Sequence, residues 1–227
     1  MPRSRINFFP LAGPFVLLLF LLLGLLILFF EFGAIRYAYE KIGIDRHYVF
    51  GLFALSLLGS YINIPFGELP KEQVISDQVI SFFGMRYVIP IVREQRKTVI
   101  AINLGGAVIP VLLSFFLVFK HDMLGRTILA VSIVTLVVYA TARPLKGIGI
   151  AVPMFVPPFA AAGTALLLAP DSAPVIAYVA GTLGTLIGGD VMNLRKLRGL
   201  GAPVASIGGA GTFDGIFLAG IIAVLLA

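Results

Sequence analysis

Long apolar stretches without a charged residue are the feature that most constrains this chain. The first covers residues 11–30, and others follow at intervals to the C-terminus. Each approaches the roughly 20 residues that a helix needs to cross the hydrocarbon core of a bilayer. Charged residues make up only 12% of the chain, about half the usual share. The sequence therefore predicts an all-α, polytopic membrane helix bundle and excludes an ordinary soluble domain.

Breaks in the apolar pattern divide the chain into about seven predicted spans, which form one transmembrane domain over residues 1–227. The expected spans are residues 11–30, 48–65, 98–119, 128–142, 147–169 and 172–189, and a last one from near Gly211. A cleaved signal peptide competes for the first run, but no small-residue cleavage site follows it, which favours an uncleaved span. The mixed-charge segment from Arg36 to His47 is expected to be a loop.

Proline predicts broken helices, because it removes a backbone donor inside a span. The fifth predicted span contains Pro153, Pro157 and Pro158. We expect a kink or two half-helices there, and a full crossing and a re-entrant hairpin both fit.

The longest polar stretch, residues 67–97, is expected to be a cytoplasmic or interfacial loop. Its apolar residues at helical spacing are Ile75, Val79, Phe82 and Phe83. This spacing favours a helix lying on the membrane surface. Alternation over residues 86–92 fits a short strand equally well.

The basic residues predict the orientation of the chain. With seven spans and a cytoplasmic N-terminus, twelve of the 17 lysines and arginines fall inside and five outside. The five are Arg36, Lys41, Arg46, Lys120 and Arg126. Cytoplasmic loops carry the excess of such residues, so this predicts an N-terminus inside and a multi-pass protein of the cell membrane. Topology thus accounts for the net charge of +6, and nucleic acid is not an expected partner.

Two aspartates near the C-terminus, Asp190 and Asp214, are the candidate catalytic residues. Asp214 is the one charged residue after Arg198, and a carboxylate at the bilayer centre costs roughly 2.5–3.5 kcal/mol on insertion scales. A helix from Thr212 to Ala227 is about 24 Å long, shorter than the roughly 30 Å hydrocarbon core. We therefore expect Asp214 in the first turn of a helix that begins inside the bilayer, where the helix N-terminus favours a negative charge.

Asp190 ends the sixth span on the cytoplasmic side, where the helix of Asp214 is also expected to begin. Glycines at 181, 184 and 188 permit close helix contact. The two carboxylates are therefore expected to approach each other. The structural alternatives are an Asp214 that only caps a broken helix and an interfacial Asp190 paired with Arg195 or Arg198.

Small and amide residues near the broken helices are candidate binding residues. They are Asn103, Asn193, Gly208, Gly209, Gly211 and Thr212. The asparagines equally suit a role in satisfying exposed backbone groups. Neither a metal nor a cofactor is expected, because the chain lacks cysteine and an HExxH motif, and His47 and His121 are isolated in predicted loops.

Several segments resemble an uncharacterised bacterial and archaeal membrane family, domain of unknown function sixteen-fourteen. They are ARP at 142–144, GIGI at 147–150, PP at 157–158, AYVAGTLGTLIGGD at 177–190 and GGAGTFDGIF at 208–217. The resemblance implies a multi-pass membrane protein and carries no established activity or site.

A second, fainter resemblance concerns the GxGD intramembrane aspartyl proteases. GGD at 188–190 followed by LRKL at 194–197 is similar to their motif. Ile187 stands where the first glycine should be, and no Pro-Ala-Leu element follows Asp214.

Three functions fit these features, with the lipid bilayer as the expected partner in each. Transport of a small ion or solute would use broken helices and a protonatable Asp214, but not Asp190. Hydrolysis of a transmembrane peptide would need both carboxylates within roughly 3–6 Å, one as base and one as acid. In a structural scaffold the acids would only hold the fold. Oligomeric state is not indicated by the sequence.

Overall fold

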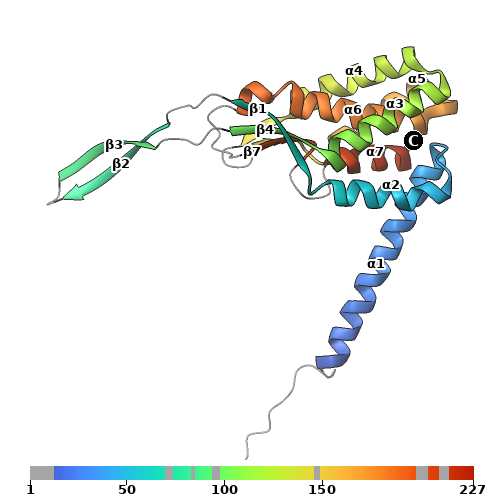
Figure 1. Ribbon diagram of the computed structural model, residues 1–227, viewed down its shortest axis with the longest axis horizontal. Coiled ribbons are helices and arrows are strands. Elements are labelled where there is room, and N and C mark those ends of the chain that lie inside the picture. The colour runs from blue at the N-terminus through green and yellow to red at the C-terminus, as the bar shows by residue number, and fades with distance from the viewer. Residues whose placement is uncertain are drawn as a thin grey trace, which may run out of the picture.

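The computed structural model describes residues 13–69, 74–82, 85–93, 98–145, 149–197, 204–209 and 215–227. Over these ranges the chain is mostly helical, which confirms the predicted class in its coarse form (Figure 1). The helices are α1 (Gly13–Lys41), α2 (Arg46–Gly59), α3 (Ile109–His121), α4 (Leu124–Thr141), α5 (Val156–Leu168), α6 (Ala173–Thr185) and α7 (Gly215–Leu226). Two π-helices, η1 (Leu104–Val108) and η3 (Leu186–Val191), and two 3₁₀-helices, η2 (Pro170–Ser172) and η4 (Leu194–Leu197), adjoin them.

Strands, which the predicted fold class did not include, form three small sheets among the described residues. They are β1 (Asn63–Leu69), β2 (Val74–Phe82), β3 (Met85–Arg93), β4 (Thr98–Asn103), β5 (Arg143–Leu145), β6 (Gly149–Ala151) and β7 (Val204–Ile207). The largest sheet has the order β1-β4-β7, with β1 antiparallel and β7 parallel to β4. It lies at one end of the helices (Figure 1).

Within the described residues, three helical stretches are long and apolar enough to cross a membrane. They are Leu104–His121, Leu124–Thr141 and Pro170–Val191. The apolar helices α5 and α7 have only 13 and 12 residues, or about 20 and 18 Å at 1.5 Å per residue. The protein therefore has helices suited to a membrane, while seven complete spans and their orientation stay predictions.

Two predicted spans are wrong at the ends nearest the sheet. The second was expected to reach Pro65, but α2 ends at Gly59 and β1 begins at Asn63. The third was expected to be helical from Thr98, but this stretch is strand β4 and the helical stretch begins at Leu104. The β-branched run of β4 suits a strand, and apolarity alone cannot separate a buried strand from a helix.

The fifth predicted span is a strand followed by a short helix. β6 pairs with β5, and α5 begins only at Val156. Pro157 and Pro158 lie in the first turn of α5, where a missing backbone N–H breaks no intrahelical hydrogen bond. The predicted interruption by proline is confirmed, although a strand and a single helix of 13 residues replace the expected kink or pair of half-helices.

The predicted surface helix within residues 67–97 is wrong, and the alternative of a strand is confirmed. β2 and β3 form an antiparallel hairpin in which Val79 pairs with Val88. Of the residues at helical spacing, Ile75, Val79 and Phe82 lie on β2, and Phe83 is outside the described residues. The same polar stretch carried both periodicities, and pairing with a neighbouring strand satisfies the backbone of both segments.

The expected loop from Arg36 to His47 is mostly helical. α1 continues to Lys41, where Arg36 Nε lies 2.9 Å from Glu40 Oε1 one turn later. At this end Tyr39 is buried and packs on Tyr178 of α6, with ring centroids 6.5 Å apart. Apolar contacts with the bundle thus outweigh the mixed charges of the segment.

Helix α6 forms the centre of the bundle, with α3, α4, α5 and α7 packed around it. Ala173, Ile176, Ala177 and Ala180 of α6 are fully buried in one core cluster with residues of α4 and α5. The predicted sixth span is confirmed as a helix and is extended by the π-helix η3 to Val191.

The contact between α4 and the end of α6 requires glycine. A Cβ added at Gly184 would lie 2.6 Å from Val134 Cγ1, and one at Gly188 would overlap the backbone carbonyl oxygen of Thr135. Gly184 and Gly188 thus permit close contact with α4, whereas they were expected against the last span. Of the three glycines, Gly181 lies against α7, where an added Cβ would be 3.1 Å from Ala219 O.

We expect Gly188→Ala to destabilise the protein by about 1–3 kcal/mol, because the new methyl group forces two backbones apart. The matched control is Gly163→Ala on α5, where a Cβ meets nothing within 4 Å. The control should be neutral or stabilising by up to about 1 kcal/mol. Thermal unfolding of the purified protein in detergent measures both, and equal melting temperatures for the two variants would contradict the α4–α6 packing.

Candidate functional site

Two π-helices mark the sheet end of the bundle. η1 precedes α3 and contains Gly105 and Gly106, while η3 follows α6 and contains Gly188 and Gly189. Single turns of π-helix within α-helices are rare, and those that occur are often at functional sites. Each is bordered by one of the predicted asparagines.

Asn103 connects η1 to the turn after α2. This fully buried side chain donates through Nδ2 to Ser60 O at 2.6 Å and to Asn63 Oδ1 at 3.0 Å. Its Oδ1 accepts the N–H of Gly106 at 2.7 Å, as an N-cap does. Asn63 Oδ1 also accepts from Ser206 Oγ of β7, so the network reaches across the sheet.

Asn193 holds the end of η3 in a similar way. Its Nδ2 donates to the carbonyl oxygens of Gly188 at 2.7 Å and Gly189 at 3.0 Å. The side chain is fully buried, and Oδ1 has no hydrogen-bond partner among the described residues. A buried acceptor without a partner is costly, which makes Asn193 an unusual feature of this end of the bundle.

Gly208 joins the two π-helices. Its N–H donates to Asp190 Oδ2 on η3 at 2.8 Å, and its carbonyl oxygen occupies the space that a Cβ on Gly106 of η1 would need. Gly208 and Gly209 have φ angles of +86° and +84°, which favour glycine. A Cβ on Gly208 would also lie 2.6 Å from that of Ala107.

A cavity of about 300 Å³ lies beside Asp190. The residues that line it come from β6, η3, the end of α6 and the start of α7, and are Ile150, Ala151, Val152, Thr185, Gly189, Asp190, Gly215 and Ile216. Asp190 is the ionisable residue among them and is partly buried. The hydroxyl of Thr185 donates its proton to Gly181 O at 2.5 Å. Its Oγ1 can therefore act toward the cavity only as a hydrogen-bond acceptor.

The structure brings together Asp190 and Gly208 from the predicted site residues, with Gly209 next in the chain. Asn103 and Asn193 border the two π-helices, as described above. Asp214, Gly211 and Thr212 lie outside the described residues, so the predicted approach of the two carboxylates stays a prediction. Gly215, which follows Asp214 in the sequence, lines the Asp190 cavity.

The sequence did not predict that β6 and Thr185 line this cavity. β6 had been assigned to a membrane span, and Thr185 is one of several threonines on apolar helices. No local signal distinguishes either. In the described part of the chain, no group of three or more histidine, aspartate or glutamate residues could hold a metal ion.

These features define a largely helical protein with apolar helices able to cross a membrane and a carboxylate at a break between them. The chain belongs to the family described as "Protein of unknown function (DUF1614)", whose model matches residues 57–226. The match confirms the first family resemblance and includes both π-helices, whereas it lends no support to the GxGD likeness. Searches of curated proteins and of solved structures each found no significant match.

We expect Asn103→Asp to destabilise the protein, because the replaced Nδ2 would put an oxygen against Ser60 O and Asn63 Oδ1. The buried carbonyl oxygen of Ser60 would lose this donor, at a cost of about 1–3 kcal/mol, while the partly buried Asn63 Oδ1 would keep only Ser206 Oγ. The matched control is Asn63→Asp, which keeps the accepting oxygen used by Asn103 and Ser206. Thermal unfolding should show a clear loss for the first variant and a small one for the second, and the reverse order would contradict this network.

Proposed function

We propose that the protein transports a small cation or a small solute coupled to one, through the cavity beside Asp190. The observation that carries the proposal is the meeting of a carboxylate with the ends of three interrupted elements. These are η3 at the end of a candidate span, β6 before the short helix α5, and the start of the short helix α7. Secondary transporters bind ions and solutes where discontinuous helices end inside the protein.

The setting of Asp190 supports a cation as the bound species. Ionisable residues in membrane segments are costly and generally face a protein interior or a water-filled cavity. Asp190 is partly buried, and the N–H of Gly208 orients Oδ2. A cavity of about 300 Å³ is much larger than a single water molecule needs, so a hydrated ion or small solute can approach the carboxylate.

This proposal changes the role first given to Asp190. The sequence suggested transport that needs Asp214 but not Asp190, with Asn103 as a further possible ligand. Because Asp190 lines the cavity, we add it as a proposed cation ligand. Gly215 also lines the cavity, so Asp214, its neighbour in the sequence, stays a proposed ligand.

Hydrolysis of a transmembrane peptide is a second candidate function, favoured by the same position of Gly215 beside Asp190. It requires both carboxylates at one site, so Asp190→Asn and Asp214→Asn should each abolish cleavage. Incubation of the protein with a labelled transmembrane peptide tests this, and transport without any cleavage product would exclude it.

We expect Asp190→Asn to reduce cation flux at least about tenfold, because the neutral amide cannot attract or exchange a cation as the carboxylate does. The full chain would be reconstituted in vesicles containing a dye for protons, Na⁺ or K⁺, with a gradient of the matching ion imposed in each case. The asparagine oxygen can still accept from Gly208, so the fold should persist, and unfolding temperature checks this.

The matched control is Asp171→Asn, at the opposite, exposed end of the same helical stretch Pro170–Val191. It should transport like the wild type. Wild-type flux for Asp190→Asn, or no flux above empty vesicles for the unmodified chain under all three gradients, would overturn the proposed function.

A further inference from the structure

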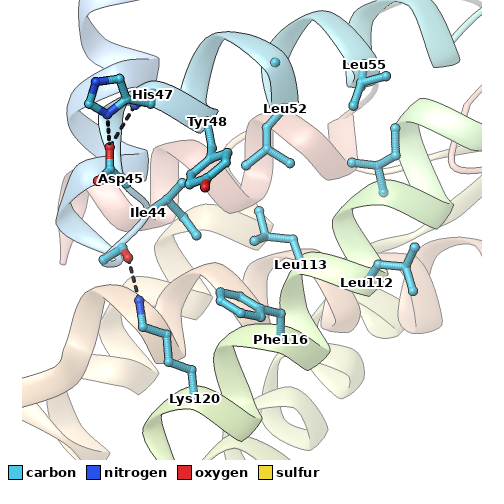
Figure 2. Close-up of a pocket in the computed structure, with 13 residues that line it drawn as sticks. Ile44, Asp45, His47, Tyr48, Leu52, Leu55, Leu112, Leu113, Phe116 and Lys120 are labelled. Carbon is cyan, nitrogen blue, oxygen red and sulfur yellow. Dashed lines mark hydrogen bonds and ion pairs between the residues drawn. The ribbon is translucent and has the colours of Figure 1, made fainter.

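A second cavity, of about 670 Å³, is a groove between α2 and α3 (Figure 2). It is distinct from the Asp190 cavity, because the two cavities share no lining residue. Its volume is in the range of about 300–1,000 Å³ that is typical of ligand sites. The main apolar side chains that line it are Leu52, Leu55, Ile109, Leu112, Leu113 and Phe116.

The polar groups of the groove gather at one end. Figure 2 shows Lys120 of α3 and the pair Asp45–His47 at the start of α2 at this end, with Leu55 and Leu112 toward the other. Lys120 Nζ donates to Gly43 O at 2.6 Å and lies 5.7 Å from the ring centroid of Phe116. The groove therefore has an amphiphilic layout, with a long apolar part and a charged mouth.

Lys120 places a positive charge at the mouth. Lys120 forms no ion pair with any carboxylate in the described part of the chain. The nearby carboxylate of Asp45 accepts from His47 N at 2.9 Å and contacts His47 Nδ1 at 2.7 Å. These contacts of His47, first that of its backbone N–H, lower the pKa of Asp45. Asp45 thus bonds to His47 and caps α2. Among the described residues, the ammonium group of Lys120 contacts the carbonyl oxygen of Gly43 and the ring of Phe116, and pairs with no carboxylate.

The apolar part of the groove is open to the surroundings. The residues Leu112, Leu55 and Phe116 are 63%, 59% and 52% exposed. Lys120 is near the end of the candidate span Leu104–His121, where lysine side chains reach the polar surface of a bilayer. Tyr48, beside the mouth, is of a residue type enriched at this level. With Leu104–His121 across a bilayer, the long axis of the groove would run from the polar surface toward the hydrocarbon core.

We infer that this groove binds one phospholipid with an anionic headgroup, its phosphate at Lys120 and one acyl chain along α2 and α3. Basic side chains between membrane helices recognise such headgroups through the charge of the phosphate. The acyl chain packs along the exposed side chains of Leu55, Leu112 and Phe116. This inference is independent of the proposed transport at Asp190.

Native mass spectrometry of the purified full chain, released from detergent, tests the inference. Phosphatidylglycerol and phosphatidylcholine with identical acyl chains would be titrated separately, so that only headgroup charge differs. We expect the first phosphatidylglycerol to bind about fivefold more tightly than phosphatidylcholine. Lys120→Gln should remove this preference, and Leu55→Trp, which fills the apolar part, should weaken both lipids. Glycerol phosphate, which lacks acyl chains, should not compete.

The matched control is Lys196→Gln. Lys196 is also exposed and lies 4.4 Å from an aromatic ring centroid, that of Tyr139, but it does not line the groove. It should keep the preference for phosphatidylglycerol. Equal binding of both lipids, or equal loss in both lysine variants, would overturn the inference. A dimer that Leu55→Trp dissociates would also overturn it, because a second copy of the chain would then cover the groove.

Discussion

The junction at Gly208 is the contact on which the rest of the described structure depends. Its N–H holds Asp190 of η3, and its carbonyl oxygen lies against Gly106 of η1. One residue after strand β7 therefore joins the ends of two apolar helical stretches. The space is so small that a Cβ at Gly106 or Gly208 would collide with backbone or Ala107. Close backbone approach of this kind is available only to glycine.

Around this junction, strands continue apolar helices directly. α2 leads into β1, and β4 leads into η1 and α3. Helices that stop inside an apolar environment leave backbone N–H and C=O groups that need partners. The β1-β4-β7 sheet and the buried side chains of Asn103 and Asn193 supply them. The backbone beside Asp190 can therefore be irregular while its N–H and C=O groups still have hydrogen-bond partners. Both proposed activities at Asp190 require such a backbone.

Particular residues show which parts of the fold and of the candidate site could be predicted from the sequence. Asp190, Asn103 and Asn193 could be selected because a polar residue beside an apolar run needs a partner or a function. The prolines at 157 and 158 located the interruption before α5. The strand from Thr98 could not be distinguished from the start of a helix, since its side chains suit both and only pairing with β1 and β7 selects one. The same ambiguity led the segment of the β2–β3 hairpin to be predicted as a helix.

The sequence by itself determined an apolar, helix-rich protein of this family, with breaks at its prolines and glycines and a carboxylate at the end of the sixth apolar run. These are properties of composition and local order. Tertiary structure alone decided that Gly208 meets Asp190, 18 residues earlier, and that Lys120 reaches Gly43 across 77 residues to complete the mouth of the groove. Such contacts depend on how closely whole helices and strands can pack, and no local pattern of residues encodes that distance.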